Sequence, residues 1–201
     1  GADCVRELIR PPFYFYLTLE QMYLIGVRSI LLVAVTAIAT GSVMALQFGY
    51  GLEKFGGQLY VPKVLALSFV REMGPVFTSL LVAARIGSGI TAEVGSMNVT
   101  QQIDAMRALG TSPIKKIVIP RLLATMITLP ILTVFSNFIG LFGGMLVMVK
   151  EMNQTADFFF TKAVETLTLH DFTMGFVKTL VFAVFISLTA CYRGMKTTGG
   201  T

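Results

Sequence analysis

The sequence has 201 residues, of which 54% are hydrophobic and only 13% are charged, and its mean hydropathy is +0.74. Soluble domains carry about 25% charged residues, so this composition excludes an ordinary soluble domain and indicates a protein whose solvent is the bilayer. The net charge of +5 therefore bears on orientation and on contact with anionic headgroups, and does not imply nucleic acid.

The N-terminal segment, residues 1–28, is predicted to lie in the headgroup layer. Its residues 5–17 mix charged, aliphatic and aromatic side chains and are interrupted by Pro11 and Pro12, which suits an interfacial segment. The first span follows at residues 29–48, a run without any charge that is close to the roughly 20 apolar residues needed to cross the hydrocarbon core. Residues 49–63 are rich in glycine and read as a short interfacial turn.

Three further spans are predicted after this turn. The second, residues 64–91, contains Arg71 and Glu72 followed by Gly74 and Pro75, so we expect a kinked or broken helix. The third covers residues 122–149 and the fourth residues 172–192, and a short amphipathic helix is expected around 158–167 between them. The predicted fold class is an all-α polytopic membrane bundle with an interfacial N-terminal helix and a short cytoplasmic coupling helix.

Positive charge in the connections predicts a cytoplasmic N-terminus, because cytoplasmic loops carry an excess of Lys and Arg. More Lys and Arg residues lie in one group of segments, which consists of the N-terminal segment, the connection 93–121 and the C-terminal end. They contain Arg6, Arg10, Arg28, Arg107, Lys115, Lys116, Arg121, Arg193 and Lys196, against Lys54, Lys63, Lys150 and Lys162 in the other connections. This choice places residues 93–120, the predicted coupling loop, in the cytoplasm.

Residues 98–110 have the pattern of a short amphipathic helix, with Asn98 as N-cap and Gly110 as the stop. Apolar residues recur on one face at helical spacing. They are Val99, Ile103, Met106 and Leu109. A helix this short is marginal alone in water, so its apolar face must dock against a partner or against the membrane or its own bundle.

The run DAMRALGTSPIKKIVIP, residues 104–120, resembles the coupling loop of ABC-transporter permeases, which inserts a helix into a groove of the ATPase. Longer segments are similar to the MlaE/YrbE permease family of MCE lipid-transport systems: REMGPVFTSLLVAARIGSGITAEVGSM at 71–97, VTQQIDAMRALGTSPIKKIVIPRLLA at 99–124 and LPILTVFSNFIGLFGG at 129–144. By this resemblance Glu93, Val99, Ile103, Met106, Arg107 and Leu109 are the candidate residues for ATPase coupling.

The resemblance implies one permease domain over residues 1–201, located in a bacterial inner membrane and moving phospholipid between the inner and outer membranes to maintain lipid asymmetry. It implies a homodimer between two cytoplasmic ABC ATPases, a periplasmic MCE-domain hexamer and a small STAS-domain accessory protein. No cofactor is expected on the chain, because ATP would be bound by the ATPase. The family ordinarily has a further spanning helix after a loop like TTGGT, and this chain is expected to lack it.

Arg71 and Glu72 are candidate lipid-binding residues, because a charge at the centre of a span costs about 2.5–3.5 kcal/mol on insertion scales. In the family the Arg-Glu-x-Gly-Pro motif lies beside the lipid cavity, and Arg71 is suited to hold a phosphate through bidentate bonds. Pro75 also removes the hydrogen bond to the Arg71 carbonyl, which would open the helix to a headgroup. The competing interpretation is an intramolecular ion pair that holds two helices.

Met44 and Phe55 are candidate walls for acyl chains, with ordinary packing as the competing interpretation. Arg85 is expected to snorkel at the end of the second span, and Glu93 to anchor the start of the coupling loop. Small residues spaced four apart favour close helix packing. They are Ala83, Gly87 and Thr91 in the second span and Gly140 and Gly144 in the third.

Catalysis by this chain is not indicated. His170 beside Asp171 has no nucleophile near it in sequence, no phosphate-binding GxxxxGK[ST] loop is present, and the carboxylates lack metal-ligand spacing. Two alternatives to the lipid permease remain. An ABC import permease for a small solute would need a polar central pocket, and a channel or ion-coupled transporter would need ion sites in matching halves, of which no internal repeat gives a sign.

Overall fold

The computed structural model describes residues 15–197, and this part of the chain is almost entirely helical, without strands. Four helical stretches are long and apolar enough to cross a membrane, at Phe15–Glu53, Gln58–Val99, Ile114–Glu151 and Leu169–Met195. The predicted all-α class with four spans is therefore confirmed. Residues 1–14, which include half of the predicted interfacial segment together with Arg6 and Arg10, and residues 198–201 of the TTGGT loop lie outside the described residues.

The first stretch consists of α2 (Phe15–Gly26), a 3-10 turn at Val27–Ser29 and α3 (Ile30–Glu53). The predicted turn 49–63 is shorter than expected, because α3 continues to Glu53 and a 3-10 turn at Gln58–Tyr60 leads directly into α4 (Val61–Ser68). Pro62 sits at the start of α4, where a missing N–H leaves no helical hydrogen bond unmade.

The second stretch is a continuous helix with two π-helical turns, not a broken one. A π turn at Phe69–Met73 joins α4 to α5 (Gly74–Val82), and another at Ala83–Gly87 joins α5 to α6 (Ser88–Val99). Both turns contain the charged residues that mark this span, Arg71 with Glu72 and Arg85. A single π turn absorbs an irregularity without ending the helix and is frequent at functional sites.

The remaining elements are α7 (Gln102–Ala108), a π turn at Ile114–Val118, α8 (Ile119–Glu151), α9 (Ala156–Thr166) and α10 (Leu169–Met195). The expected helix around 158–167 is confirmed as α9, with Thr155 as its N-cap. The third and fourth spans are both longer than predicted. Apolar runs underestimate membrane helices because polar residues at the ends continue the hydrogen-bonding pattern.

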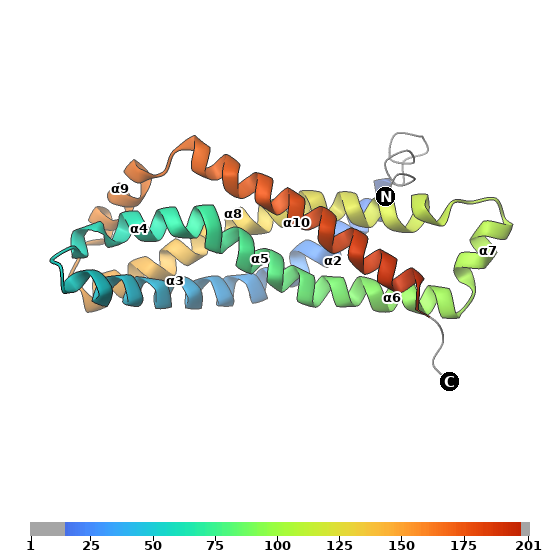
Figure 1. Cartoon of the computed structure of the whole chain (residues 1–201), viewed down its shortest axis with the longest axis horizontal. Coiled ribbons are helices and arrows are strands. Elements are labelled where there is room, and N and C mark those ends of the chain that lie inside the picture. The colour runs from blue at the N-terminus through green and yellow to red at the C-terminus, as the bar shows by residue number, and fades with distance from the viewer. Residues whose placement is uncertain (1–14, 198–201) are drawn as a thin grey trace. The chain divides into compact units, whose positions relative to one another are not determined.

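The chain forms two compact units. Unit 1 comprises residues 1–29, 80–129 and 180–201, and unit 2 comprises residues 30–79 and 130–179. The core of unit 1 contains Ile90 and Val94 from α6, Ile103 from α7 and Leu122 from α8. Figure 1 shows α7 as the short helix that follows α6, and the two are in contact.

Unit 2 has its own core, in which Leu65 of α4 and Phe159 of α9 are completely buried. Helix α4 lies beside both α3 and α9 (Figure 1). Helices α3 and α8 approach closely, because a Cβ added at Gly41 would overlap the backbone of Gly140. Ser42 also donates a hydrogen bond of 3.2 Å to the carbonyl of Gly143, so the contact is a small-residue helix interface.

Candidate functional site: paired charges beside an apolar cavity

The two adjacent charged residues of the second span, Arg71 and Glu72, each have a partner on α10, within unit 2. Arg71 Nε lies 2.9 Å from Asp171 Oδ1, and Lys178 Nζ lies 2.5 Å from Glu72 Oε1. The interpretation of Arg71 and Glu72 as members of ion pairs between helices therefore holds for this conformation. The side chain of Arg71 remains 39% exposed, so pairing with Asp171 does not remove it from contact with a ligand.

Lys178 also reaches the backbone carbonyl of Arg71, to which Pro75 has no N–H to donate. Pro75 cannot donate to the Arg71 carbonyl, and Lys178 Nζ lies 3.2 Å from that oxygen and donates to it. The carbonyl that Pro75 leaves without a helical hydrogen bond therefore has a partner on α10 in this conformation, and headgroup binding at this turn stays a prediction. Helix α10 comes this close because Gly175 faces the turn, where an added Cβ would lie only 2.8 Å from the Val70 carbonyl oxygen.

Asp171 is held in place from its own side. Its Oδ2 accepts hydrogen bonds of 2.8 Å from the Thr168 backbone N–H and 2.7 Å from the Thr168 hydroxyl. The carboxylate lies near the start of α10, where a negative charge is favoured by the helix dipole. Asp171 is buried and therefore gives Arg71 a fixed anchor.

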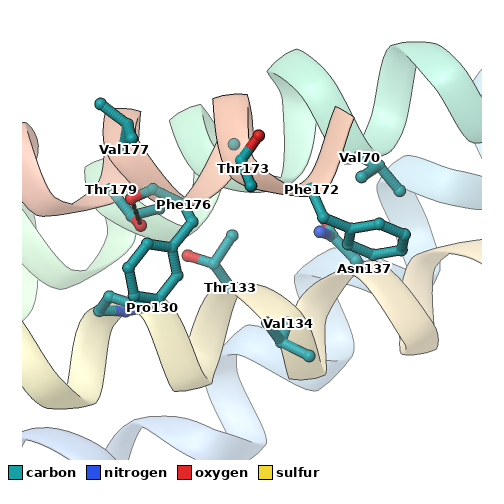
Figure 2. A pocket seen from close by; sticks show the side chains of 11 residues that line it. Val70, Pro130, Thr133, Val134, Asn137, Phe172, Thr173, Phe176, Val177 and Thr179 are labelled. Atoms are coloured by element: carbon teal, nitrogen blue, oxygen red, sulfur yellow. Dashed lines mark hydrogen bonds between the residues drawn. The ribbon is translucent and has the colours of Figure 1, made fainter. Parts of the chain in front are cut away.

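Beside these pairs lies a cavity of about 330 Å³. Figure 2 shows the ring of Phe176 pointing from α10 toward Pro130 on α8, and the ring of Phe172 beside Asn137 at the end of the cavity where Val70 lies. Val70 and Phe172 directly neighbour Arg71 and Asp171 in sequence. Unit 2 thus contains an apolar cavity bordered by residues next to the charged ones.

Asn137 is the unusual polar group of this cavity. It is buried, and its Oδ1 has no hydrogen-bond partner among residues 15–197. The oxygen packs against Gly74, since a Cβ added there would overlap it. Leaving a buried amide oxygen unsatisfied costs about 1–3 kcal/mol, which is a common sign of a site with a role beyond packing.

Met44 and Phe55 are not among the residues that line this cavity. Met44 is partly buried and packs against the core of unit 2, and Phe55 is 86% exposed in the turn after α3. Neither is therefore brought together with Arg71 inside unit 2. For Met44 the competing interpretation, ordinary packing, describes its contacts.

In unit 1 the predicted coupling region starts at an ion pair. Glu93 Oε1 lies 2.8 Å from Arg121 Nη2, and Arg121 Nη1 donates a 3.1 Å hydrogen bond to the Ile117 carbonyl. Arg121 is buried, and no described residue forms a hydrogen bond with its Nε. The pair connects α6 to α8 at the two ends of the coupling loop.

The predicted single apolar face of the coupling helix is wrong. Gln101 has a left-handed backbone with φ of 58° and separates α6 from α7. Val99 on α6 and Ile103 on α7 therefore do not lie on one face of a single helix. Ile103 is 1% exposed in the chain's own core, whereas Leu109 is 82% exposed. Of the four residues of the predicted face, Leu109 and Val99 are the two whose side chains are at least half exposed and could contact a partner.

Other features of the coupling helix also differ from the expectation. Asn98 is not its N-cap, because this residue lies within α6 and its Nδ2 donates to the Thr197 carbonyl at 3.0 Å. Met106 is partly buried against the core of unit 1. Arg107 forms an exposed pair with Asp104 at 2.9 Å. Gly110 does end the helix as predicted, with φ of 72°.

The glycines proposed for packing differ in their surroundings. A Cβ added at Gly140 would overlap the ring of Phe69, and one at Gly144 would lie 2.5 Å from Leu65 Cδ2. A Cβ added at Gly87 would meet only Ile186, at an ordinary 3.8 Å. Within the chain, Gly140 and Gly144 leave no space for a side chain, whereas Gly87 has ordinary space, and a contact of Gly87 with a second copy stays a prediction.

Sequence analysis missed Lys178, Asp171 and Asn137 as members of the site. Lys178 gave a signal that could have been used, since it is a charge within the predicted fourth span and such charges mark functional positions. Asn137 gave none, because asparagine is common at polar positions of many kinds. Within residues 15–197 no group of three metal-ligating side chains gathers.

Four spans with intramembrane charge pairs define the class as a polytopic helical membrane protein, and comparison with known proteins gives the family. The family model of permease MlaE matches residues 18–201. The chain belongs to the MlaE permease family.

Relatives agree with this assignment. The chain is 40% identical over 190 residues to a probable ABC transporter permease protein of Rickettsia typhi, covering 94% of this chain and 73% of that protein. It is 33% identical to the intermembrane phospholipid transport system permease protein MlaE of Haemophilus influenzae, covering 90% and 70%. It is also 32% identical to the chloroplastic protein trigalactosyldiacylglycerol 1 of Arabidopsis thaliana, covering 100% and 57%.

Proposed function

We propose that this chain is the membrane-spanning permease subunit of an ABC transporter that moves phospholipid between the inner and outer membranes and so maintains lipid asymmetry. The family match and the printed role of the Haemophilus relative support this function. The observation that carries it within the molecule is the apolar cavity beside a partly exposed arginine. A phospholipid needs both a cation for its phosphate and an apolar surface for its chains.

In this proposal Arg71 binds the headgroup phosphate, and Asp171 holds the guanidinium in position while it does so. An arginine whose Nε is fixed by a carboxylate loses little additional freedom on binding, which favours affinity. Glu72 keeps Lys178 in place by the ion pair described above. Met44 and Phe55 remain candidate contacts for acyl chains, at positions other than the cavity.

ATP hydrolysis is assigned to a separate ABC ATPase, because nothing in the sequence suits nucleotide binding. Its docking site on the permease would include Leu109, Val99 and Arg107, with Glu93 fixing the start of the loop through Arg121. The transporter would contain two copies of this chain, two ATPases, a periplasmic MCE-domain hexamer and a STAS-domain accessory protein. The chain itself would carry no cofactor, and its N-terminus would be cytoplasmic.

The test compares Arg71→Ala and Arg71→Lys in the assembled complex, with Arg193→Ala as a control that removes an exposed arginine of unit 1. Phospholipid per assembled complex and ATP-dependent lipid transfer between vesicles are measured on one preparation. We expect Arg71→Ala to lower both while the complex still forms and hydrolyses ATP. Arg71→Lys should restore only part, because an ammonium lacks the planar two-pronged geometry.

A purely structural role for Arg71 gives a different result. If the Arg71–Asp171 pair only braces two helices, Arg71→Ala lowers the yield of complex but leaves normal lipid in each complex that assembles. That outcome would remove the headgroup role. The apolar lining of the cavity disfavours the alternative hypothesis of a small-solute permease. Absence of copurified phospholipid would favour that alternative.

A further inference from the structure

A second cavity, of about 240 Å³, lies inside unit 1 between α2 and the α6 side of the second span. Arg28 and Gln21 line it from the first stretch, and Arg85 and Glu93 line it from the second. The remaining wall is mostly aliphatic and includes Leu24, Ile86 and Ile90. The cavity does not include Arg71 or any other residue of the unit 2 site.

The charges around this cavity do not balance. Glu93 is the single acidic residue among the described residues that line it, and that carboxylate already pairs with Arg121. Arg85 Nη1 donates to the Arg28 carbonyl and lies 3.3 Å from the Ser29 hydroxyl, so its partners are uncharged. No described residue forms an ion pair with Arg28 or Arg85. Two exposed arginines therefore line one cavity without a counter-ion from residues 15–197.

Uncompensated cations near apolar walls are unfavourable, and an anion that enters between them relieves the cost. Arginine is the side chain best matched to phosphate, because its fork of N–H groups binds two oxygens at once. The cavity is smaller than the roughly 300–1,000 Å³ of pockets for drug-sized ligands. It therefore suits a headgroup rather than a whole lipid.

The surface next to the cavity suits the rest of a lipid. Tyr23 and Val27 of the first stretch are both more than half exposed and precede Arg28 in sequence by five positions and one position. In a bilayer such apolar surface is covered by acyl chains. An amphiphile with a phosphate group can therefore place its headgroup in the cavity and its chains against α2.

We propose that Arg28 and Arg85 form a binding site for the phosphate of an anionic glycerophospholipid, separate from the Arg71 site. This inference goes beyond the proposed transport function, because it requires only that the chain lies in a bilayer. A bound lipid would fix α2 against α6 through its headgroup. Phosphate is the recognised group, and the surrounding membrane is its source.

The experiment uses the full chain with its copurifying partners in phosphatidylcholine nanodiscs that contain a photoactivatable phosphatidylglycerol. Crosslinked label is mapped onto α2 and α6 and quantified for the unchanged chain, Arg28→Gln and Arg28→Lys. Arg193→Gln is the matched control, since it removes one exposed arginine of the same unit that does not line the cavity. Labelling at the Arg71 π turn is measured in parallel, so that this site and the transport site are scored independently.

We expect Arg28→Gln to reduce label on α2 and α6 about tenfold, the scale of one lost charged hydrogen bond. Arg28→Lys should reduce it less, and Arg193→Gln should leave it unchanged. Equal label in Arg28→Gln and the unchanged chain would overturn the proposal, as would an equal loss in Arg193→Gln. Inorganic phosphate is added as a competitor, and saturable displacement of the label by it at the same strength would overturn the lipid as the source.

Discussion

Lys178 satisfies two groups that the second span leaves without partners in an apolar environment. One is the Glu72 carboxylate. The other is the Arg71 carbonyl, to which Pro75 cannot donate because proline has no backbone N–H. Asp171 forms the ion pair that neutralises the Arg71 side chain. The four residues form a charge-neutral group within unit 2, which explains how this span tolerates two adjacent charges.

Lys178→Met should therefore lower the stability of the protein. The ion-pair side chains are 35% and 55% exposed, so solvent screening limits their share, and together with the lost hydrogen bond we expect about 1–2 kcal/mol. The measurement is the thermal unfolding midpoint in detergent. Lys162→Met is the control, because it removes a similarly exposed pair with Glu165 on α9. Equal shifts in the two variants would contradict a special role for Lys178.

At the scale of elements, α3 and α8 are held together by small residues. Gly41 and Gly140 meet backbone to backbone, and neither position has space for a methyl group. Van der Waals contact of this kind drives helix association in membranes, where the hydrophobic effect between helices is absent. The sequence analysis identified Gly140 and Gly144 but not their partner Gly41.

Gly41→Ala should separate α3 from α8 and destabilise the protein by about 1–3 kcal/mol, the usual cost of overpacking. Gly51→Ala on the same helix is the control, since an added Cβ there has open space. That change should be neutral or stabilising by up to about 1 kcal/mol, because alanine favours helix more than glycine does. Thermal unfolding of both variants is compared, and a Gly41→Ala midpoint at or above that of Gly51→Ala would refute the close contact.

The apolar residues of α7 and of the position just after it have different surroundings. Ile103 belongs to the core of unit 1, and Leu109 faces outward just beyond the helix. The two positions therefore predict different defects when a charge is introduced. This difference separates folding from docking within one short segment.

Leu109→Asp should abolish copurification of the ATPase while the permease still accumulates in the membrane, because only an exposed contact gains a charge. Ile103→Asp should instead reduce the amount of folded permease, since burying an unpaired carboxylate is strongly unfavourable. Val164→Asp, at an exposed position on α9, is the control and should leave both readouts unchanged. Normal ATPase copurification with Leu109→Asp would exclude Leu109 from the docking surface.

At the scale of the whole molecule, four spans place the connections alternately on the two sides of the membrane. A cytoplasmic N-terminus puts α7 in the cytoplasm and the turn around Lys54 on the periplasmic side. Both Ala108 on α7 and Lys54 are exposed. Each can therefore carry a label without disturbing a core.

In a background with Cys4→Ser and Cys191→Ser, a membrane-impermeant maleimide added to intact spheroplasts should label Lys54→Cys and not Ala108→Cys. Permeabilised cells serve as the control, in which both positions should react. The physical reason is that the excess of Lys and Arg in the connections keeps their segments on the cytoplasmic side. Labelling of Ala108→Cys alone in intact spheroplasts would invert the proposed orientation.

The sequence by itself determined the number of spans and the amphipathic helix α9. A bilayer leaves no solvent for backbone groups, so every sufficiently long apolar run must become a helix. It also located Arg71, Glu72 and Glu93, because charges stand out in apolar runs. The family resemblance came from the same segments.

Only the tertiary structure decided what these charges contact. Arg71 pairs with Asp171, and Glu72 with Lys178, across about half of the chain. Such pairs depend on the rotation and register of separate helices, which the spacing within one helix does not encode. Ile103 is a local example. The sequence predicted that it faces a docking partner, but the left-handed backbone at Gln101 starts a separate helix in which Ile103 packs into the core.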